Sequence, residues 1–178
     1  MRLNRYFAAA TSALLLALGG CGILNNEGSG YVCPNTAILE GPGELVRFTT
    51  GSANGPNDVS FRSKMNTVSG TCEVDEKTIT MELSIAMEAS RGPANTKGEA
   101  QFVYFVAILD KDKKILTRTK FPMIAKFKRD ETKLDFSESV TVTIPKKKDD
   151  LPEEFMVYMG FEMTPEELAY NRNRQRNR

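Results

Sequence analysis

The sequence contains no histidine and no tryptophan, and only three of its 178 residues are cysteine. Without imidazole there is no Ser-His or Cys-His nucleophile pair, no His-ligated zinc or haem, and no general base whose unperturbed pKa lies near 7. Most familiar hydrolase designs are therefore excluded. We predict that the protein is not an enzyme, that it has no catalytic residues, and that it needs no metal and no cofactor.

The chain has little excess charge and is short. Its 178 residues fit one ordinary domain with appendages, and 40% apolar residues suffice for a single core. The 24 Lys and Arg residues nearly balance 23 Asp and Glu residues. Charged residues make up 26%, close to the average for globular proteins, which argues against general disorder.

Residues 1–20 have the pattern of a signal peptide. Arg2 and Arg5 form a charged start, residues 7–18 are an apolar run, and two glycines follow. The run is much shorter than the ~20 residues that cross a hydrocarbon core, so we do not expect a permanent spanning helix. Because the signal exports the chain, we expect no nucleic-acid partner.

The next residue carries a more specific signal. Leu-Gly-Gly-Cys at 18–21 resembles the lipobox of bacterial lipoproteins, in which the cysteine sulfur receives a diacylglycerol and becomes the acylated N-terminus. The resemblance implies that Cys21 is lipidated, and several acyl chains give stable attachment because each buried CH₂ contributes about 0.8 kcal/mol. Gly22, in place of Asp, implies sorting to the outer membrane, with the protein facing the periplasm. The alternative is a soluble secreted protein with an unmodified cysteine.

Residues 21–32 are expected to form a lipidated, flexible tether, since they are rich in Gly, Asn and Ser. With Cys21 acylated, Cys33 and Cys72 remain as a pair in an oxidising compartment. We predict a disulfide between them that joins the first strand to the third. Two free thiols or a metal site are the alternatives, but two cysteines without histidine offer too few ligands.

From Cys33 onward the apolar residues recur with period two, which is typical of β-strands. Residues 79–89 alternate strictly and predict a strand with one wet face. The pattern of residues 59–74 changes parity, which requires a break or bulge near Asn66. Residues 102–109 are apolar at both parities and predict a central strand covered on both faces.

Further runs at 45–49, 115–127, 134–144 and 155–163 complete about seven or eight strands, separated by Gly, Pro and Asp turns. The predicted fold is an all-β, antiparallel, immunoglobulin-like two-sheet sandwich over residues 33–163. A small closed barrel is the alternative. Thr164, Pro165 and Glu167 match a capping box, which predicts a short helix over about 165–171 within the terminal segment 164–178.

A set of segments together resembles a group of small lipoproteins of alphaproteobacteria: the lipobox, Cys33-Pro34, the 69–72 and 102–109 segments, and the closing 164–172 stretch. The likeness spans most of the mature chain. That group has no assigned activity, so the resemblance implies location and fold and carries over no catalytic or binding residue.

Two candidate chemistries have simpler explanations. Met156, Met159 and Met163 invite a copper hypothesis, but on a strand Met156 points opposite to Met159, and the other two lie about 13 Å apart. We interpret them as core residues. The acidic pairs at 149–150 and 153–154 could serve glycoside hydrolysis, but three neighbouring lysines favour a solvated loop.

The C-terminal tail carries an arginine at every second residue: Arg172, Arg174, Arg176 and Arg178. In an extended conformation all four guanidinium groups would project to one side and could bind anions, such as lipid phosphates, peptidoglycan carboxylates or an acidic protein surface. The alternative is a frayed terminus.

Two functions remain. The first is a non-catalytic interaction or assembly module of the cell envelope, attached to the membrane by its lipid anchor and bound to an envelope protein; its oligomeric state is open. The second is a carrier of a small apolar ligand such as a lipid, which would need an empty apolar cavity of at least ~300 Å³.

Overall fold

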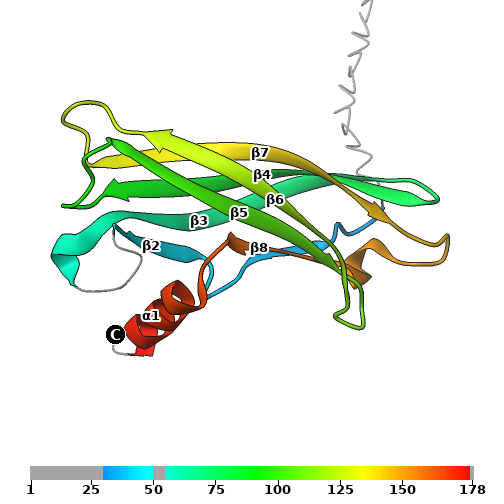
Figure 1. The fold of residues 1–178 in the computed structure, drawn as a ribbon. Helices are drawn as coiled ribbons and strands as arrows, with labels where there is room; N and C mark the ends of the chain where they lie inside the picture. Colours follow the sequence, from blue (N-terminus) through cyan, green and yellow to red (C-terminus); the bar gives the residue numbers. More distant parts are fainter. Residues whose placement is uncertain (1–29, 50–54, 177–178) are drawn as a thin grey trace, which may run out of the picture.

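A computed structural model describes residues 30–49 and 55–176, which form two β-sheets followed by one α-helix (Figure 1). The elements are β1 (Asn35–Ile38), β2 (Glu44–Phe48), β3 (Val59–Val74), β4 (Thr78–Arg91), β5 (Glu99–Leu109), β6 (Ile115–Lys126), β7 (Lys133–Pro145), β8 (Met156–Phe161) and α1 (Pro165–Arg176), with 3₁₀ turns at Pro56–Asp58 and Pro152–Glu154. The predicted lipidation site Cys21, most of the tether and Arg178 lie outside the described residues.

The strand order is β2-β3-β4-β7 in the first sheet and β1-β8-β5-β6 in the second. All neighbouring strands run antiparallel except β1 and β8, which are parallel. The predicted two-sheet sandwich with a short C-terminal helix is confirmed. Immunoglobulin constant domains have the order A-B-E-D and C-F-G, whereas β2, β3 and β4 are consecutive neighbours here. The likeness therefore holds for the two packed sheets and not for the strand order.

Strand β4 supplies much of the interior from the first sheet, as its alternation predicts. Its odd-numbered residues from Ile79 to Ala89 are buried at 1% exposure or less, and the intervening residues, such as Glu82 and Ser84, face outward. The outward positions of β3, β4 and β7 are mostly Ser, Thr and charged residues. Burial on one face and solvent on the other thus explain the period-two pattern.

The bulge expected near Asn66 is present in β3. The pairing of β3 with β4 shifts register between Met65 and Thr67, so Met65 opposes Met87 and Val68 opposes Ile85. One extra residue restores the inward direction of the apolar side chains after the parity change.

Strand β5 is central in the second sheet, between β8 and β6, and its residues from Tyr104 to Ile108 are all buried. On the inner face, Phe102 meets Phe161 edge-on, with ring centroids 5.1 Å apart. On the outer face, the Arg118 guanidinium lies 3.9 Å from the centroid of the Phe105 ring. The segment predicted to be covered on both faces is therefore confirmed.

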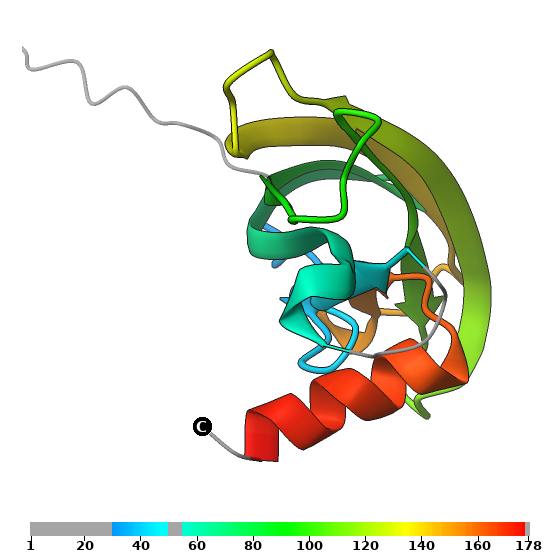
Figure 2. The same ribbon diagram turned by 60° about the vertical axis from the view of Figure 1, so that its left-hand side comes forward.

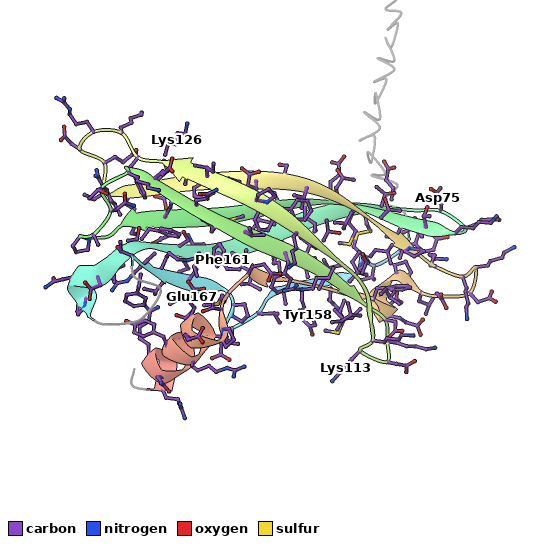
Figure 3. The ribbon with its side chains drawn as sticks, in the orientation of Figure 1. Asp75, Lys113, Lys126, Tyr158, Phe161 and Glu167 are labelled. Atoms are coloured by element: carbon purple, nitrogen blue, oxygen red, sulfur yellow. A yellow bond between two sulfur atoms is a disulfide. The ribbon has the colours of Figure 1, made fainter. Side chains whose placement is uncertain are left out.

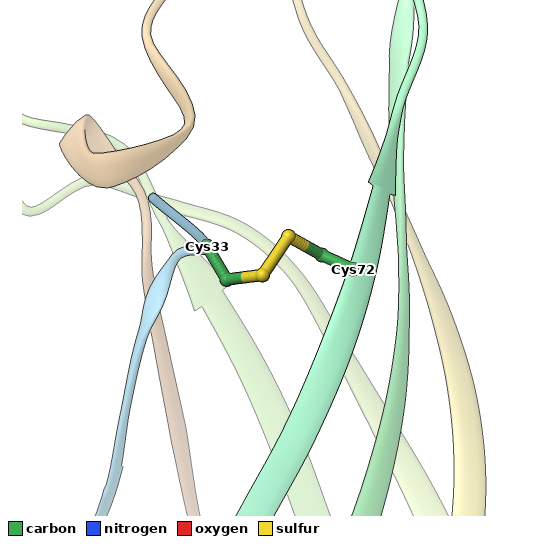
Figure 4. Close-up of a disulfide and its surroundings, with 2 residues drawn as sticks. All are labelled: Cys33 and Cys72. Carbon is green, nitrogen blue, oxygen red and sulfur yellow. A yellow bond between two sulfur atoms is a disulfide. The ribbon is translucent and has the colours of Figure 1, made fainter. Parts of the chain in front are cut away.

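The disulfide between Cys33 and Cys72 is present, with 5.8 Å between the Cα atoms (Figure 4). Cys33 lies just before β1 in the second sheet, and Cys72 lies in β3 of the first. The bond thus joins the two sheets near the end of the sandwich marked by Asp75, opposite to the end marked by Lys126 (Figure 3).

One inward position carries a charge. Glu138 of β7 pairs directly with Ile85, a fully buried residue, so its side chain lies on the same inner face of the sheet. Burial, together with the charge of Glu138, raises the pKa of Tyr104 from 10.0 to about 12. Tyr104 also stacks on Phe121, with ring centroids 5.1 Å apart.

We expect an absorbance titration to show a late tyrosine step with a pKa of about 12, which we assign to Tyr104. The folded protein keeps this phenol protonated to higher pH than the unfolded chain does. Its contribution to stability is therefore complete below pH 10 and is lost between about pH 10 and 12, amounting to roughly 2 kcal/mol. Tyr104→Phe should remove the late step and reduce this loss; an equal loss in both proteins would contradict the assignment.

Candidate interaction surface

Helix α1 begins at the capping box that the sequence predicts. The backbone N–H of Glu167 donates to Thr164 Oγ1 at 3.2 Å, and the N–H of Thr164 donates to Glu167 Oε2 at 2.9 Å. The backbone N–H of Glu166 and the Thr164 hydroxyl lower the pKa of the Glu166 carboxyl. The backbone N–H groups of Thr164 and Glu167 are thus hydrogen-bonded by side chains of the same turn. These bonds fix the residue at which the chain leaves the sheet and enters the helix.

The helix packs against strand β2 (Figure 2) rather than extending into solvent. Its buried Glu167 carboxylate lies 2.7 Å from Arg47 Nε, and the ring of Tyr170 meets that of Phe48 edge-on with centroids 5.1 Å apart. Arg47 and Phe48 both belong to β2. An ion pair and an aromatic contact therefore both attach α1 to β2.

Further along the helix, Asn171 is 1% exposed, and its Nδ2 donates to the carbonyl oxygens of Gly41 and Glu44. Arg174 forms an ion pair with the Glu44 carboxylate. These contacts hold the second half of α1 against the segment that leads into β2.

The expectation of an extended arginine tail is wrong for residues 172–176, because these residues are helical. Two residues along a helix correspond to about 200°, so consecutive arginines point to opposite sides. Arg174 faces the sheet and is paired, whereas Arg172 and Arg176 are exposed on the other side. The helix also continues five residues beyond the predicted end at Asn171, because the contacts of its docked face stabilise it.

Arg172 and Arg176 line one surface groove of about 690 Å³, together with Leu168 of the same helix and the 40–42 segment. We call this the arginine groove; its full lining is Glu40, Gly41, Pro42, Leu168, Arg172 and Arg176. The two arginines are four residues apart, so they are neighbours on one helix face. Their planar donors lie beside apolar Pro42 and Leu168, an arrangement suited to carboxylates on an otherwise apolar segment.

Sequence reasoning found the arginines but missed the other half of the groove. Nothing local marks the 40–42 segment as the neighbour of Leu168, since the two are far apart along the chain. A side chain at Gly41 would place its Cβ 3.3 Å from Leu168 Cδ1, so a small residue permits the close approach. The i, i+4 spacing of Arg172 and Arg176 behind a capping box is the signal that could have indicated a helical arginine pair.

Both acidic pairs and two of the three methionines lie as their simpler explanations predict, whereas Met156 is partly buried on the opposite face of β8 and is not part of the core. Met159 is fully buried in the core, Met163 packs partly buried against it, and Met156 accepts a hydrogen bond from the Tyr158 hydroxyl at 3.5 Å. In the loop after β7, Asp150 accepts from the N–H of Lys147 and Glu154 from that of Leu151, so both carboxylates support the loop backbone.

The sequence matches no protein-family model and none of the curated proteins. In the described part of the chain, no helix is both long and apolar enough to cross a membrane. Over the same residues, no group of three or more Cys, Asp or Glu side chains is arranged to hold a metal ion.

Proposed function

We propose that the protein is a non-catalytic interaction module of the bacterial cell envelope, anchored to the outer membrane through acylated Cys21 and binding an acidic segment of an envelope protein in the arginine groove. The arginine groove carries this proposal. Arg174 is paired with Glu44, while Arg172 and Arg176 are exposed in a groove that they share with Glu40, Pro42 and Leu168; Arg176 also donates to Asn173 Oδ1.

The placement of the ends is consistent with an anchored module. The described chain starts at Gly30, a few residues before the disulfide, at the end of the sandwich that Asp75 marks (Figure 3). Glu167 of α1 lies toward the opposite end (Figure 3). A lipid anchor at Cys21 would therefore leave the helix and its groove accessible to a partner. The lipobox and the likeness to small alphaproteobacterial lipoproteins support this location.

The carrier function is less well supported. The interior between the sheets is one packed cluster of apolar side chains. The grooves of about 690 and 660 Å³ are open at the surface and are lined in part by charged residues. An apolar ligand held between the sheets would need space that these side chains fill.

The groove is tested with Arg172→Glu/Arg176→Glu. We expect at least tenfold lower recovery of crosslinked envelope proteins from intact cells, measured by quantitative mass spectrometry, because two favourable charges become repulsive. Lys128→Glu/Arg129→Glu is the matched control; it makes the same charge change on the exposed loop between β6 and β7 and should leave recovery unchanged. Equal recovery with both variants would exclude the groove, and no enrichment with the unaltered protein would overturn the module function.

The anchor is tested separately with Cys21→Ser. We expect the unaltered protein to carry acyl mass on residue 21 and to sediment with membranes. The variant should lack that mass and should be released by osmotic shock, since the hydrocarbon chains supply the attachment. An unaltered protein that has a free Cys21 thiol and diffuses freely would contradict the anchor while leaving the groove experiment valid.

A further inference from the structure

Strand β5 has a complete partner on one side and an incomplete one on the other. Its pairing with β6 runs from Glu99 to Leu109, over the whole strand. On the opposite side, β8 pairs with it only from Tyr104 to Leu109. On that side, Glu99 O accepts from Asn95 Nδ2 at 2.9 Å, so the part of β5 that lacks a partner there, its free edge, is short and centred on Gln101.

The alternation of the ladder shows which backbone groups face this edge. Phe127 N–H donates to Gly98 O at 2.9 Å on the β6 side, and Glu162 N–H donates to Val103 O at 2.8 Å on the β8 side. Even-numbered residues of β5 thus bond to β6, and odd-numbered ones face β8. Gln101 faces the free edge, and among the described residues neither its N–H nor its C=O has a backbone partner there.

The capping box explains why the ladder stops. By the same register, the residue that would pair with Gln101 is Thr164. Its N–H is held by Glu167 Oε2 at 2.9 Å, and Pro165 begins the helix directly afterwards. Glu162 is also fixed in place, since its carboxylate lies 2.5 Å from Arg118 Nη1. The chain is therefore held away from the position that would complete the strand.

A surface groove of about 660 Å³ lies along this edge. Four parts of the chain form its walls: the start of β5, the end of β6, the segment that enters α1, and Arg47 of β2. The lining residues are Arg47, Gln101, Phe102, Val103, Pro122, Met123, Ile124, Glu162, Met163, Thr164 and Glu167. Most of these are apolar, and Ile124 is 49% exposed, which is high for a side chain of this kind.

We propose that this edge is a strand-addition site, where an extended segment of a partner protein, with apolar side chains at alternate positions, continues the ladder of β8 along β5. The unpaired N–H and C=O of Gln101 stand in strand geometry and match the backbone of an extended segment, while the apolar side chains of the groove accept every second side chain of that segment. The site is separate from the arginine groove and does not depend on it.

The probe is a pooled library of synthetic octapeptides that alternate apolar and polar residues, screened by affinity selection against the full-length, detergent-solubilised protein. We expect selected peptides to bind the unaltered protein and to bind Ile124→Glu at least tenfold more weakly, because a charge would enter the apolar wall. Ile115→Glu is the matched control. It places the same charge on the same strand at a residue that is 57% exposed and outside the groove, and should change affinity less than twofold.

Two further measurements distinguish strand addition from adhesion of apolar side chains. N-methylation of the peptide amides at one parity should abolish binding, whereas N-methylation at the other parity should not, since only one parity faces β5. The amide of Gln101 should also become protected from hydrogen exchange when peptide binds. No selected peptide, equal losses in the two Glu variants, or equal effects of N-methylation at both parities would overturn the site.

Discussion

We expect the Cys33→Ala/Cys72→Ala variant to unfold with a free energy about 3–4 kcal/mol below that of the oxidised protein. The bond closes a loop across 39 positions of sequence, and on the loop-entropy model its removal restores conformational freedom to the unfolded chain. The native contacts of both residues add little, because each is only partly buried. Urea denaturation measures the difference, with the dependence of the unfolding free energy on urea concentration fitted separately for each protein.

Reduction provides the internal control. Dithiothreitol should lower the stability of the unaltered protein toward that of the double variant and should leave the double variant unchanged. Because the bond joins the two sheets beside β1, hydrogen exchange should increase first in β1 and in its partner β8. A double variant as stable as the oxidised protein would contradict a structural role for the bond.

The elements that could be predicted from sequence are those in which the order of apolar and polar residues along the strand itself shows which side chains are buried. Strand β4 alternates because each residue either faces the core or the solvent, and the bulge near Asn66 follows from the same rule. The run at 102–109 is apolar at both parities, and this matches closely the part of β5 that has neighbours on both sides. Before residue 103 the second strand neighbour is missing, and Gln101 is polar and exposed.

The features that could not be predicted depend on partners far along the chain. Arginine at every second position suggests an extended tail, yet the docking of Asn171 and Arg174 to the segment around Glu44 favours a helix. The parallel pairing of β1 with β8 likewise has no local signal, because it joins the two ends of the domain. Both candidate surfaces, the arginine groove and the groove beside Gln101, lie where segments far apart in the sequence meet. The spacing of residues along the chain therefore predicts neither of them.

The second large effect is expected at Phe161, the last residue of β8, which is 1% exposed. Phe161→Ala should lower the free energy of unfolding by about 3–5 kcal/mol, since it removes a buried ring and leaves a cavity between the sheets. The lost ring is also the edge-on partner of Phe102. Phe161→Leu retains most of the apolar volume and should cost less than half as much.

A double-mutant cycle with Phe102→Leu separates the ring contact from general packing. We expect a coupling of about 0.5–1.5 kcal/mol between the two positions in urea unfolding, the range found for aromatic pairs. Phe161 directly precedes the segment that turns away from β5, so Phe161→Ala should also speed hydrogen exchange at the start of α1. If Phe161→Ala cost less than about 1 kcal/mol, the end of β8 would not be fixed by the core, and the free edge of β5 would then lack its rigid wall.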